Sequence, residues 1–276
     1  MVPPLHTVAA RMLSSFGSIR ICLMVGIGSG VPSEGCDIRL GDVVVSKPGK
    51  TFGGVVQYDF KEGQFMRTGV LNKPPWMLLK AVATLQAEHE LIGSKIPQLL
   101  AEMFKKYPRM QAAYSHQGSL NDRLYQPKYV HVGDDNTCES CNVNKATYRE
   151  DRDTGVPFIH YGIIASGNQV IKDAFTRDRL KKGFDAICLE MEAAGLWDNL
   201  PCLVIRGICD YADSHKNKRW QRYAATTSAA YAKELLGMIP ASEVDEAPAA
   251  VAVISIIRDK LTTIKEALKS DQEGVF

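Results

Sequence analysis

Short apolar runs alternate along this chain with longer segments whose apolar residues recur at helical spacing. Continuous apolar runs are typical of strands buried in a parallel sheet, and the longer pattern is typical of amphipathic helices. The alternation predicts an α/β protein with a three-layer, doubly wound mixed sheet. We expect strands at 21–25, 38–46 (after a turn), 53–58 (strand or loop), 159–165, 184–189 and 201–208, helices at 6–16, 76–89, 172–182, from about 191, and 219–238, and a core-packing amphipathic stripe at 96–107.

Two segments depart from this alternation. Residues 108–156 are polar and irregular, and we expect them to form a long surface insertion. The stretch ASEVDEAPAA after Pro240 is typical of a linker, and the apolar spacing beyond it predicts a single amphipathic helix. We therefore expect one domain over 1–240, followed by a linker and one helix over 241–276. Such a helix packs back on the domain, meets a partner, or belongs to something longer, and the sequence leaves these alternatives open.

Composition narrows the class of protein. The chain has 276 residues, of which 45% are apolar, enough for a sizeable core. Its formal net charge is +2 without clustered basic residues, so we expect no nucleic-acid partner and no membrane surface. No apolar stretch reaches the roughly 18 residues of a membrane span, and the first residues do not resemble a signal peptide. The seven scattered cysteines predict reduced thiols in a cytoplasmic protein.

Polar or glycine-rich sequence follows four of the expected strands, at 26–30, 166–170, 190–192 and 209–213. In doubly wound sheets, ligands bind outside the carboxyl ends of the strands. The glycines of the first stretch would let a ligand approach the backbone N–H groups, and a tight turn without a ligand is the open alternative. The stretch is not a dinucleotide fingerprint, because Pro32 follows where a helix would have to begin.

Glu192 is placed by the pattern at a strand-to-helix junction, where a helix N-terminus keeps a carboxylate ionised. Its two oxygens match the cis-diol of a ribose. The alternative is that Glu192 is only a negative charge in the first turn of the helix and binds no ligand. We interpret Glu190 as a structural partner of Glu192 or of a nearby arginine, and we also count it among the expected substrate-binding residues.

Asp210 ends the apolar run VIRGIC. A half-buried carboxyl group at this position can have a raised pKa and donate its proton to a leaving group. The alternative is an N-cap, or a salt bridge to Arg206, which lies four residues upstream on the same face of the strand. Asp213 and Ser214 are better N-cap candidates, and we give them no catalytic role.

Cys138 and Cys141 form a CxxC pair inside the expected insertion. A structural zinc site needs four ligands, and neither a second CxxC nor an HxxxH pair lies nearby. His131 is the one other nearby candidate. We therefore expect surface thiols and no metal.

Several stretches together resemble the purine and uridine phosphorylase superfamily: GIGSGVP with LGDVVVS seven residues later, YGIIASGNQV, CLEMEAAGL and VIRGICDYADSHKNK. Over residues 5–240 the chain is most similar to the fungal branch, in which such domains stand at the N-terminus of multidomain, receptor-like proteins. The nearest enzymes by motif are the methylthioadenosine/S-adenosylhomocysteine nucleosidases. The resemblance implies a phosphorylase/hydrolase-like fold, a homo-oligomer, and C-terminal effector or repeat domains in longer relatives.

The resemblance also implies roles for individual residues. Glu192 matches the glutamate that holds the ribose 2′- and 3′-hydroxyls, and Met191 lies against the sugar. Asp210 matches the acid that protonates purine N7 while the sugar becomes oxocarbenium-like, and an aspartate there resembles the branch that accepts 6-aminopurines. Gly28 and Ser29 match the glycine-rich loop on the anomeric side of the sugar.

Other positions depart from the family pattern. Val170 matches the position whose backbone contacts the base, which is usually aromatic in bacterial nucleosidases, so we expect weaker base stacking. Cys209 stands directly before Asp210, at a position where members of the family commonly have serine. Lys216, Lys218 and Arg219 could meet substrate phosphates, although we favour a solvated basic loop.

Relative to the family, the chain lacks the first strand and helix, and with them the acidic residue that positions the attacking water or marks the phosphate side. A missing central strand would leave its neighbours with unpaired edges. The resemblance implies cleavage of the N-glycosidic bond of an adenine-type nucleoside or nucleotide, without a cofactor, by hydrolysis or by phosphorolysis with inorganic phosphate as co-substrate. The alternative is a catalytically impaired nucleotide-sensing or regulatory module of a fungal receptor-like protein.

Overall fold

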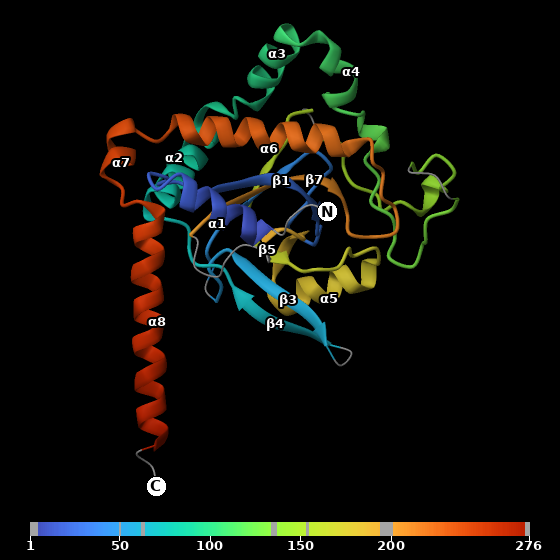
Figure 1. Ribbon diagram of the computed structural model, residues 1–276. Helices are drawn as coiled ribbons and strands as arrows, with labels where there is room; N and C mark the ends of the chain where they lie inside the picture. The colour runs from blue at the N-terminus through green and yellow to red at the C-terminus, as the bar shows by residue number, and fades with distance from the viewer. Residues whose placement is uncertain are drawn as a thin grey trace.

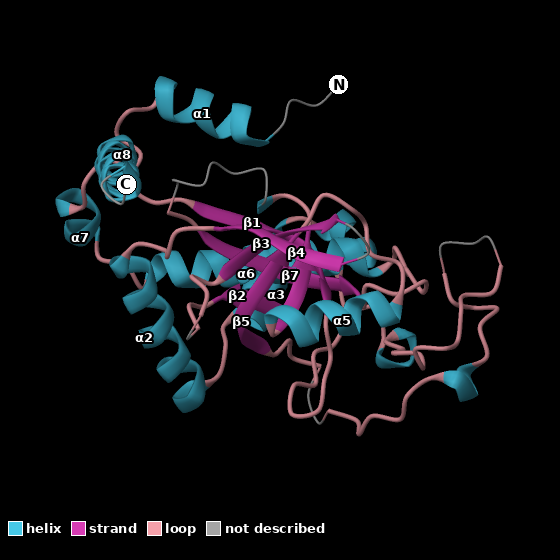
Figure 2. Cartoon of the chain, turned by 90° about the horizontal axis from the view of Figure 1, so that it is seen from below, coloured by secondary structure: helices cyan, strands magenta, loops and turns pink. Residues whose placement is uncertain are grey.

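A mixed sheet with helices on both faces forms the centre of the protein (Figures 1 and 2). The computed structural model describes residues 5–49, 51–61, 64–133, 137–152, 155–193 and 201–273. The strands are β1 (Leu23–Gly30), β2 (Val43–Ser46), β3 (Val55–Lys61), β4 (Gln64–Val70), β5 (Ile159–Ser166), β6 (Ala186–Glu190) and β7 (Leu203–Asp210). The helices longer than one turn are α1 (Leu5–Ser15), α2 (Trp76–Ile92), α3 (Ile96–Lys106), α4 (Gln111–Tyr114), α5 (Ala174–Phe184), α6 (Trp220–Gly237), α7 (Ala241–Glu246) and α8 (Ala250–Glu273).

Within the described residues, the strand order is β2-β7-β1-β6-β5-β3-β4, and β2 also pairs with β5. This extra pairing closes five strands into a ring, from which the β3–β4 hairpin extends. Helix α6 packs on β1 and β7 while α5 packs on β5 and β6, and Figure 1 shows the two helices above and below the sheet. The predicted α/β class with a mixed sheet is confirmed.

The predicted strand at 21–25 continues through the glycines that we expected to form a loop. β1 reaches Gly30 and runs parallel to β7, with an irregularity between Gly28 and Ser29. A Cβ atom on Gly26 would lie 2.1 Å from Arg206 Nη1, and one on Gly28 would lie 2.7 Å from Cys188 Sγ. The glycines therefore make room for neighbouring side chains inside the sheet, which the spacing in sequence could not show.

One edge of β1 is largely without a strand partner. β1 pairs with β6 at Ser29 and Gly30, whereas its pairing with β7 starts at Leu23. Among the described strands, the β6-facing edge from Leu23 to Gly28 is therefore unpaired, and Val25 is 39% exposed. An unpaired edge of this kind was expected from the family pattern.

Most of the other predicted elements form, and the exceptions are local. The helix expected from about residue 191 falls largely on 194–200, outside the described residues. Of the β3–β4 hairpin, only β3 was expected, as strand or loop. The strand β4 was not predicted, because its segment carries no apolar run. The stripe at 96–107 forms α3, which packs Ile96 and Leu100 in the core as expected.

The C-terminal segment contains more structure than a linker. Residues 241–246 form α7, whose Glu243 forms an ion pair with Lys80 of α2. Helix α8 is attached to the body at its start: Ala250 and Ile254 pack against Leu13 of α1, and the Ala250 N–H donates to the carbonyl of Ile19. The long remainder of α8 projects away from the sheet (Figure 1). No helix in the described part of the chain could cross a membrane.

A buried carboxylate ties β2 to β5 and to the insertion. Asp42 accepts hydrogen bonds from Arg152, from the backbone N–H of Phe158 and from His160 Nε2 at 2.9 Å. Burial alone would raise the Asp42 pKa, but the hydrogen bonds from His160 and Arg152 lower it below its ordinary value. Burial alone would lower the His160 pKa, but the hydrogen bonds to Asp42 and Cys36 raise it to about 9.

The free energy of unfolding is therefore expected to fall as the pH rises through about 9. His160 has a higher pKa in the folded state than in the unfolded chain, so its contribution is complete below about pH 6.5 and is lost as the folded pKa is passed. We expect a loss on the order of 3 kcal/mol between pH 6 and pH 10, measured by urea unfolding. His160→Gln should flatten this part of the profile, and an equal loss in the variant would contradict the assignment.

Candidate functional site

A cavity of about 150 Å³ lies where β1, β6 and β7 end, beside the segment that follows β5. The four stretches that the sequence placed at strand ends contribute to its wall. All of the predicted site residues line it: Gly28, Ser29, Val170, Glu190, Met191, Glu192 and Asp210. The structure thus brings together in one place the side chains that the sequence singled out separately.

Glu190 is a structural residue at the end of β6. Its side chain is 0% exposed, and it accepts hydrogen bonds from the backbone N–H groups of Glu192 and Ala193 and from Arg206 Nη2. Arg206 Nη2 also lies 3.2 Å from Glu192 Oε2. Both interpretations of Glu190 are confirmed, because it accepts from the backbone N–H of Glu192 and pairs with Arg206. Glu190 and Arg206 together hold the turn that presents Glu192.

The expected alternative of a salt bridge between Arg206 and Asp210 is wrong. Arg206 lies on β7 but reaches β6 across β1, and it passes over Gly26, where a side chain would collide with it. Two residues four apart on a strand share a face, but that spacing does not say which neighbouring strand their side chains reach. Strand order, which the sequence did not reveal, decided the partner.

Glu192 is presented to the cavity with its side chain 56% exposed. Partial burial raises its pKa; the charge of Arg206 opposes this rise, and the neighbouring Glu190 adds to it. An accessible carboxylate beside a fixed guanidinium can accept hydrogen bonds from two hydroxyl groups of a ligand. Met191 lies next to it in the cavity wall.

Asp210 ends β7, and its side chain is only 11% exposed. Oδ1 accepts from the backbone N–H of Ala212 at 2.9 Å, and Oδ2 lies 3.0 Å from Lys216 Nζ. The thiol of Cys209 donates to Oδ2 at 3.5 Å, and burial raises the pKa of this thiol well above its ordinary value, so it stays protonated. Asp210 therefore has one cation and two weaker donors around it inside the cavity.

The loop after β7 differs from two expectations. Lys216 is not part of a solvated basic loop, because it lines the cavity and pairs with Asp210. Asp213 and Ser214 do not cap α6, which begins at Trp220: Asp213 accepts from the N–H of His215, and Ser214 accepts from the N–H of His131. Both residues hold the loop itself.

Tyr58 is a cavity residue that the sequence did not single out. It comes from β3, in a segment expected to be strand or loop, and it lines the cavity together with Val170. Burial raises its pKa to about 12, and the charge of Glu190 adds to this, so the phenol is neutral. A Cβ atom on Gly167 would lie 2.5 Å from the Tyr58 ring, so glycine at that position lets the loop after β5 close on the ring. No local motif announces such a contact.

A second, larger cavity of about 400 Å³ lies beside the insertion. Four of its charged lining residues pair with one another: Arg149 with Asp122 at 3.0 Å, and Arg152 with Asp42 at 2.7 Å. We therefore assign these residues to holding the insertion on the domain. The smaller cavity, where the strand ends meet, is the candidate functional site.

Comparison with known proteins identifies relatives of the chain. No protein-family model matches it. It is 44% identical over 231 residues to a nucleotide-binding leucine-rich repeat (NLR)-like protein of Hyaloscypha variabilis, a match that covers 83% of this chain and 22% of that protein. The chain therefore spans about a fifth of the length of this relative.

Shorter matches are to enzymes. The chain is 30% identical over 89 residues to the 5′-methylthioadenosine/S-adenosylhomocysteine nucleosidase of Mycobacterium bovis, covering 30% of this chain and 35% of that enzyme. It is 36% identical over 72 residues to the ATP nucleosidase Cap17 of Escherichia coli, covering 24% of this chain and 14% of that enzyme. A Helicobacter pylori 5′-methylthioadenosine nucleosidase structure aligns with a TM-score of 0.49 at 16% identity, over 84% of this chain and 74% of that one.

The relatives agree with the motifs quoted above. One is the NLR-like protein of Hyaloscypha variabilis, and the others are nucleosidases. The chain is thus a relative of the methylthioadenosine/S-adenosylhomocysteine nucleosidases in the purine and uridine phosphorylase superfamily, on its fungal receptor-associated branch.

Proposed function

We propose that this chain cleaves the N-glycosidic bond of an adenine-type purine nucleoside or nucleotide. The observation that carries the proposal is the meeting of Glu192 and Asp210 in one cavity, from the ends of β6 and β7 on either side of β1. One carboxylate is half-exposed and the other is almost buried. Two carboxylates in such different surroundings suit two different roles.

In this proposal, Glu192 binds the ribose 2′- and 3′-hydroxyls, and Arg206 holds its carboxylate in place. Asp210 acts as the general acid and gives a proton to purine N7 as the bond between C1′ and N9 breaks, and the bonding electrons leave with the base. The sugar carbon is then attacked by water or by inorganic phosphate. The backbone at Gly28 and Ser29 borders the anomeric side, and no cofactor takes part.

A second candidate function is nucleotide sensing without turnover. Among the described residues that line the cavity, the carboxylates are Glu190, Glu192 and Asp210, and Glu190 is already engaged by two backbone N–H groups and Arg206. No further carboxylate in that described lining is available to orient a water molecule. The NLR-like relative, of which the chain spans a fifth, is consistent with a regulatory role.

Release of free adenine distinguishes the two functions. The full chain is incubated with adenosine, methylthioadenosine or ATP, with and without inorganic phosphate, and adenine is measured by chromatography. Adenine without phosphate indicates hydrolysis, and a requirement for phosphate with formation of a sugar 1-phosphate indicates phosphorolysis. If adenine never appears but a ligand raises the melting temperature, sensing replaces cleavage. If neither is seen, both proposals fail.

Lys216→Met tests whether the substrate carries phosphates. If Lys216 contacts a phosphate, the variant should lose about 10- to 100-fold in kcat/KM for ATP beyond its loss for adenosine, as expected for a lost charged hydrogen bond. Lys218→Met is the matched control, because Lys218 is exposed on the same loop. Equal losses on the two substrates would limit Lys216 to its contact with Asp210.

A further inference from the structure

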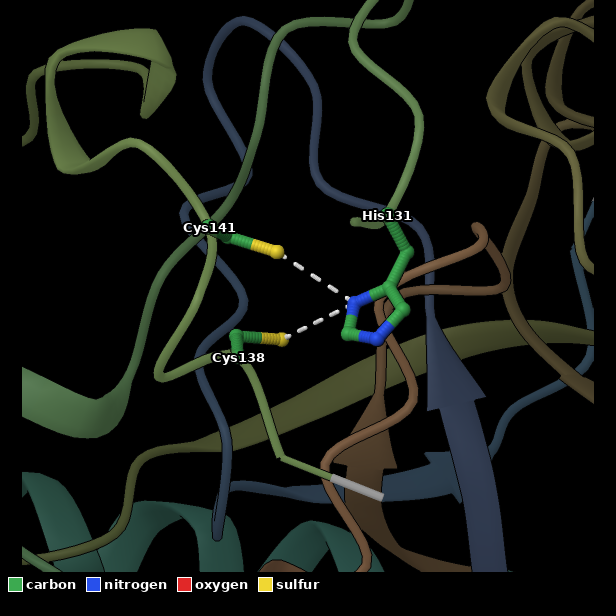
Figure 3. A group of neighbouring side chains, drawn as sticks. All are labelled: His131, Cys138 and Cys141. Atoms are coloured by element: carbon green, nitrogen blue, oxygen red, sulfur yellow. Dashed lines mark hydrogen bonds between the residues drawn. The ribbon is translucent and has the colours of Figure 1, made fainter. Parts of the chain in front are cut away.

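Three metal-ligating side chains meet in the insertion, outside the cavity. The Nδ1 atom of His131 and the Sγ atoms of Cys138 and Cys141 all lie within 4.8 Å of one another. Figure 3 shows both thiols pointing at the same side of the imidazole ring. Cys141 is buried and the other two are partly buried, so the expectation of surface thiols is wrong for Cys141.

The local backbone explains how the two thiols come together. The N–H of Cys141 donates to the carbonyl of Cys138 at 3.3 Å, which closes a tight turn and places the two cysteines side by side. His131 precedes this turn, and its N–H donates to Ser214 Oγ. The histidine is therefore fixed by the loop after β7, and the cysteines by their own turn.

The spacing of the ligand atoms matches a tetrahedral ion. His131 Nδ1 lies 3.3 Å from Cys141 Sγ and 3.9 Å from Cys138 Sγ. With zinc–sulfur bonds of about 2.3 Å and zinc–nitrogen bonds of about 2.0 Å, a tetrahedral site has nitrogen and sulfur about 3.5 Å apart. The observed distances lie on either side of this value, so an ion fits with small side-chain movements.

We infer that His131, Cys138 and Cys141 bind a zinc ion, with a water molecule as the fourth ligand. Two thiolates and one imidazole form a soft ligand set that suits zinc rather than magnesium or calcium. Binding releases the thiol protons, because the thiolate is the ligand form. The partial exposure of His131 and Cys138 leaves access for the water.

The ion would lie beside the contact between the insertion and the loop that carries Lys216. Ser214, which accepts from the His131 N–H, lies between Asp210 and Lys216 in the sequence. The ion pair between Arg219 and Glu139 joins the same two segments. A zinc ion at this point would therefore fix the part of the insertion that contacts the cavity loop, without taking part in the chemistry.

The test is metal content measured on the full chain. Protein purified under reducing conditions, loaded with Zn²⁺ and dialysed should retain one zinc ion per chain by mass spectrometry. Cys141→Ser and His131→Gln should lose it. Cys36→Ser, a partly buried cysteine outside the cluster, should retain it. Zinc absent from the loaded wild-type protein, or retained equally by Cys141→Ser, would overturn the inference.

Two further measurements on the wild-type protein do not depend on how well the variants fold. Cobalt in place of zinc should produce sulfur-to-metal charge-transfer absorption, which requires thiolate ligands. A chelator should lower the melting temperature, because metal binding contributes to folding. A cobalt-loaded protein without that absorption, or a disulfide between Cys138 and Cys141 in zinc-loaded reduced protein, would contradict the site.

Discussion

Replacing Asp210 by asparagine is expected to slow adenine release by about 10²- to 10⁴-fold, the range for loss of a general acid. Asparagine fits the same space and can still accept from the N–H of Ala212, but it has no carboxyl proton to give to the purine. The measurement is the initial rate of adenine formation at saturating substrate. Substrate binding, measured by thermal shift, should persist, because Glu192 is untouched.

Asp185→Asn is the matched control for this experiment. It makes the same chemical change at an exposed helix end, where Asp185 has φ 53°, a left-handed conformation that asparagine tolerates well. Its rate should equal that of the wild-type protein. If Asp210→Asn also keeps the wild-type rate, Asp210 is not the acid, and the proposed mechanism loses its central step.

Replacing Arg206 by methionine is expected to lower the free energy of unfolding by about 3–5 kcal/mol. The reason is the Glu190 carboxylate, which is 0% exposed and would keep only its backbone N–H partners after the guanidinium is removed. Removing one member of a buried ion pair is costly because the other charge stays buried. Urea unfolding followed by tryptophan fluorescence, to which the buried Trp220 contributes, measures the change.

A second substitution separates the lost pair from general damage. The double variant Arg206→Met with Glu190→Gln removes both charges, so it should recover part of the stability lost by the single variant. Arg109→Met, at an exposed position, should change stability by no more than about 0.5 kcal/mol. A loss below about 1 kcal/mol for Arg206→Met would show that Glu190 does not depend on the arginine.

The strand ends could be predicted from the sequence because apolar runs stop where the sheet stops. Glu190 and Asp210 each follow such a run, and each is the last residue of its strand. The rule that ligands bind at these ends then brought four separate stretches to one place. The motifs also carried the family resemblance, which the relatives support.

What the sequence could not show was which strands are neighbours. The alternative that pairs Arg206 with Asp210 rests on their shared strand face, whereas in the structure Arg206 crosses β1 to reach Glu190. The glycines of β1 were expected in a loop. In the structure they leave space for side chains of β6 and β7, which are distant in the sequence. Lys216 was expected in a solvated loop, because no sequence pattern links a basic loop residue to the carboxylate at a strand end. Each error concerns a contact between distant segments.

The insertion was the least predictable part. His131 and Cys141 are ten residues apart in a stretch without periodicity, and only the turn at Cys138 brings them together. The assignment of 241–276 as a separate linker and helix stays a prediction, although α7 contacts α2 and the start of α8 contacts α1.

Helix α8 gives the molecule a mechanical lever. Its 24 residues span about 36 Å at 1.5 Å per residue, so a tilt of about 10° at Ala250 sweeps the far end through about 6 Å. At the base of the helix, the backbone N–H of Ala250 donates a hydrogen bond to the carbonyl of Ile19. Ile19 lies just before the strand that supplies Gly28 and Ser29 to the cavity. A force applied far along the helix would therefore act, with mechanical advantage, at the root of that strand.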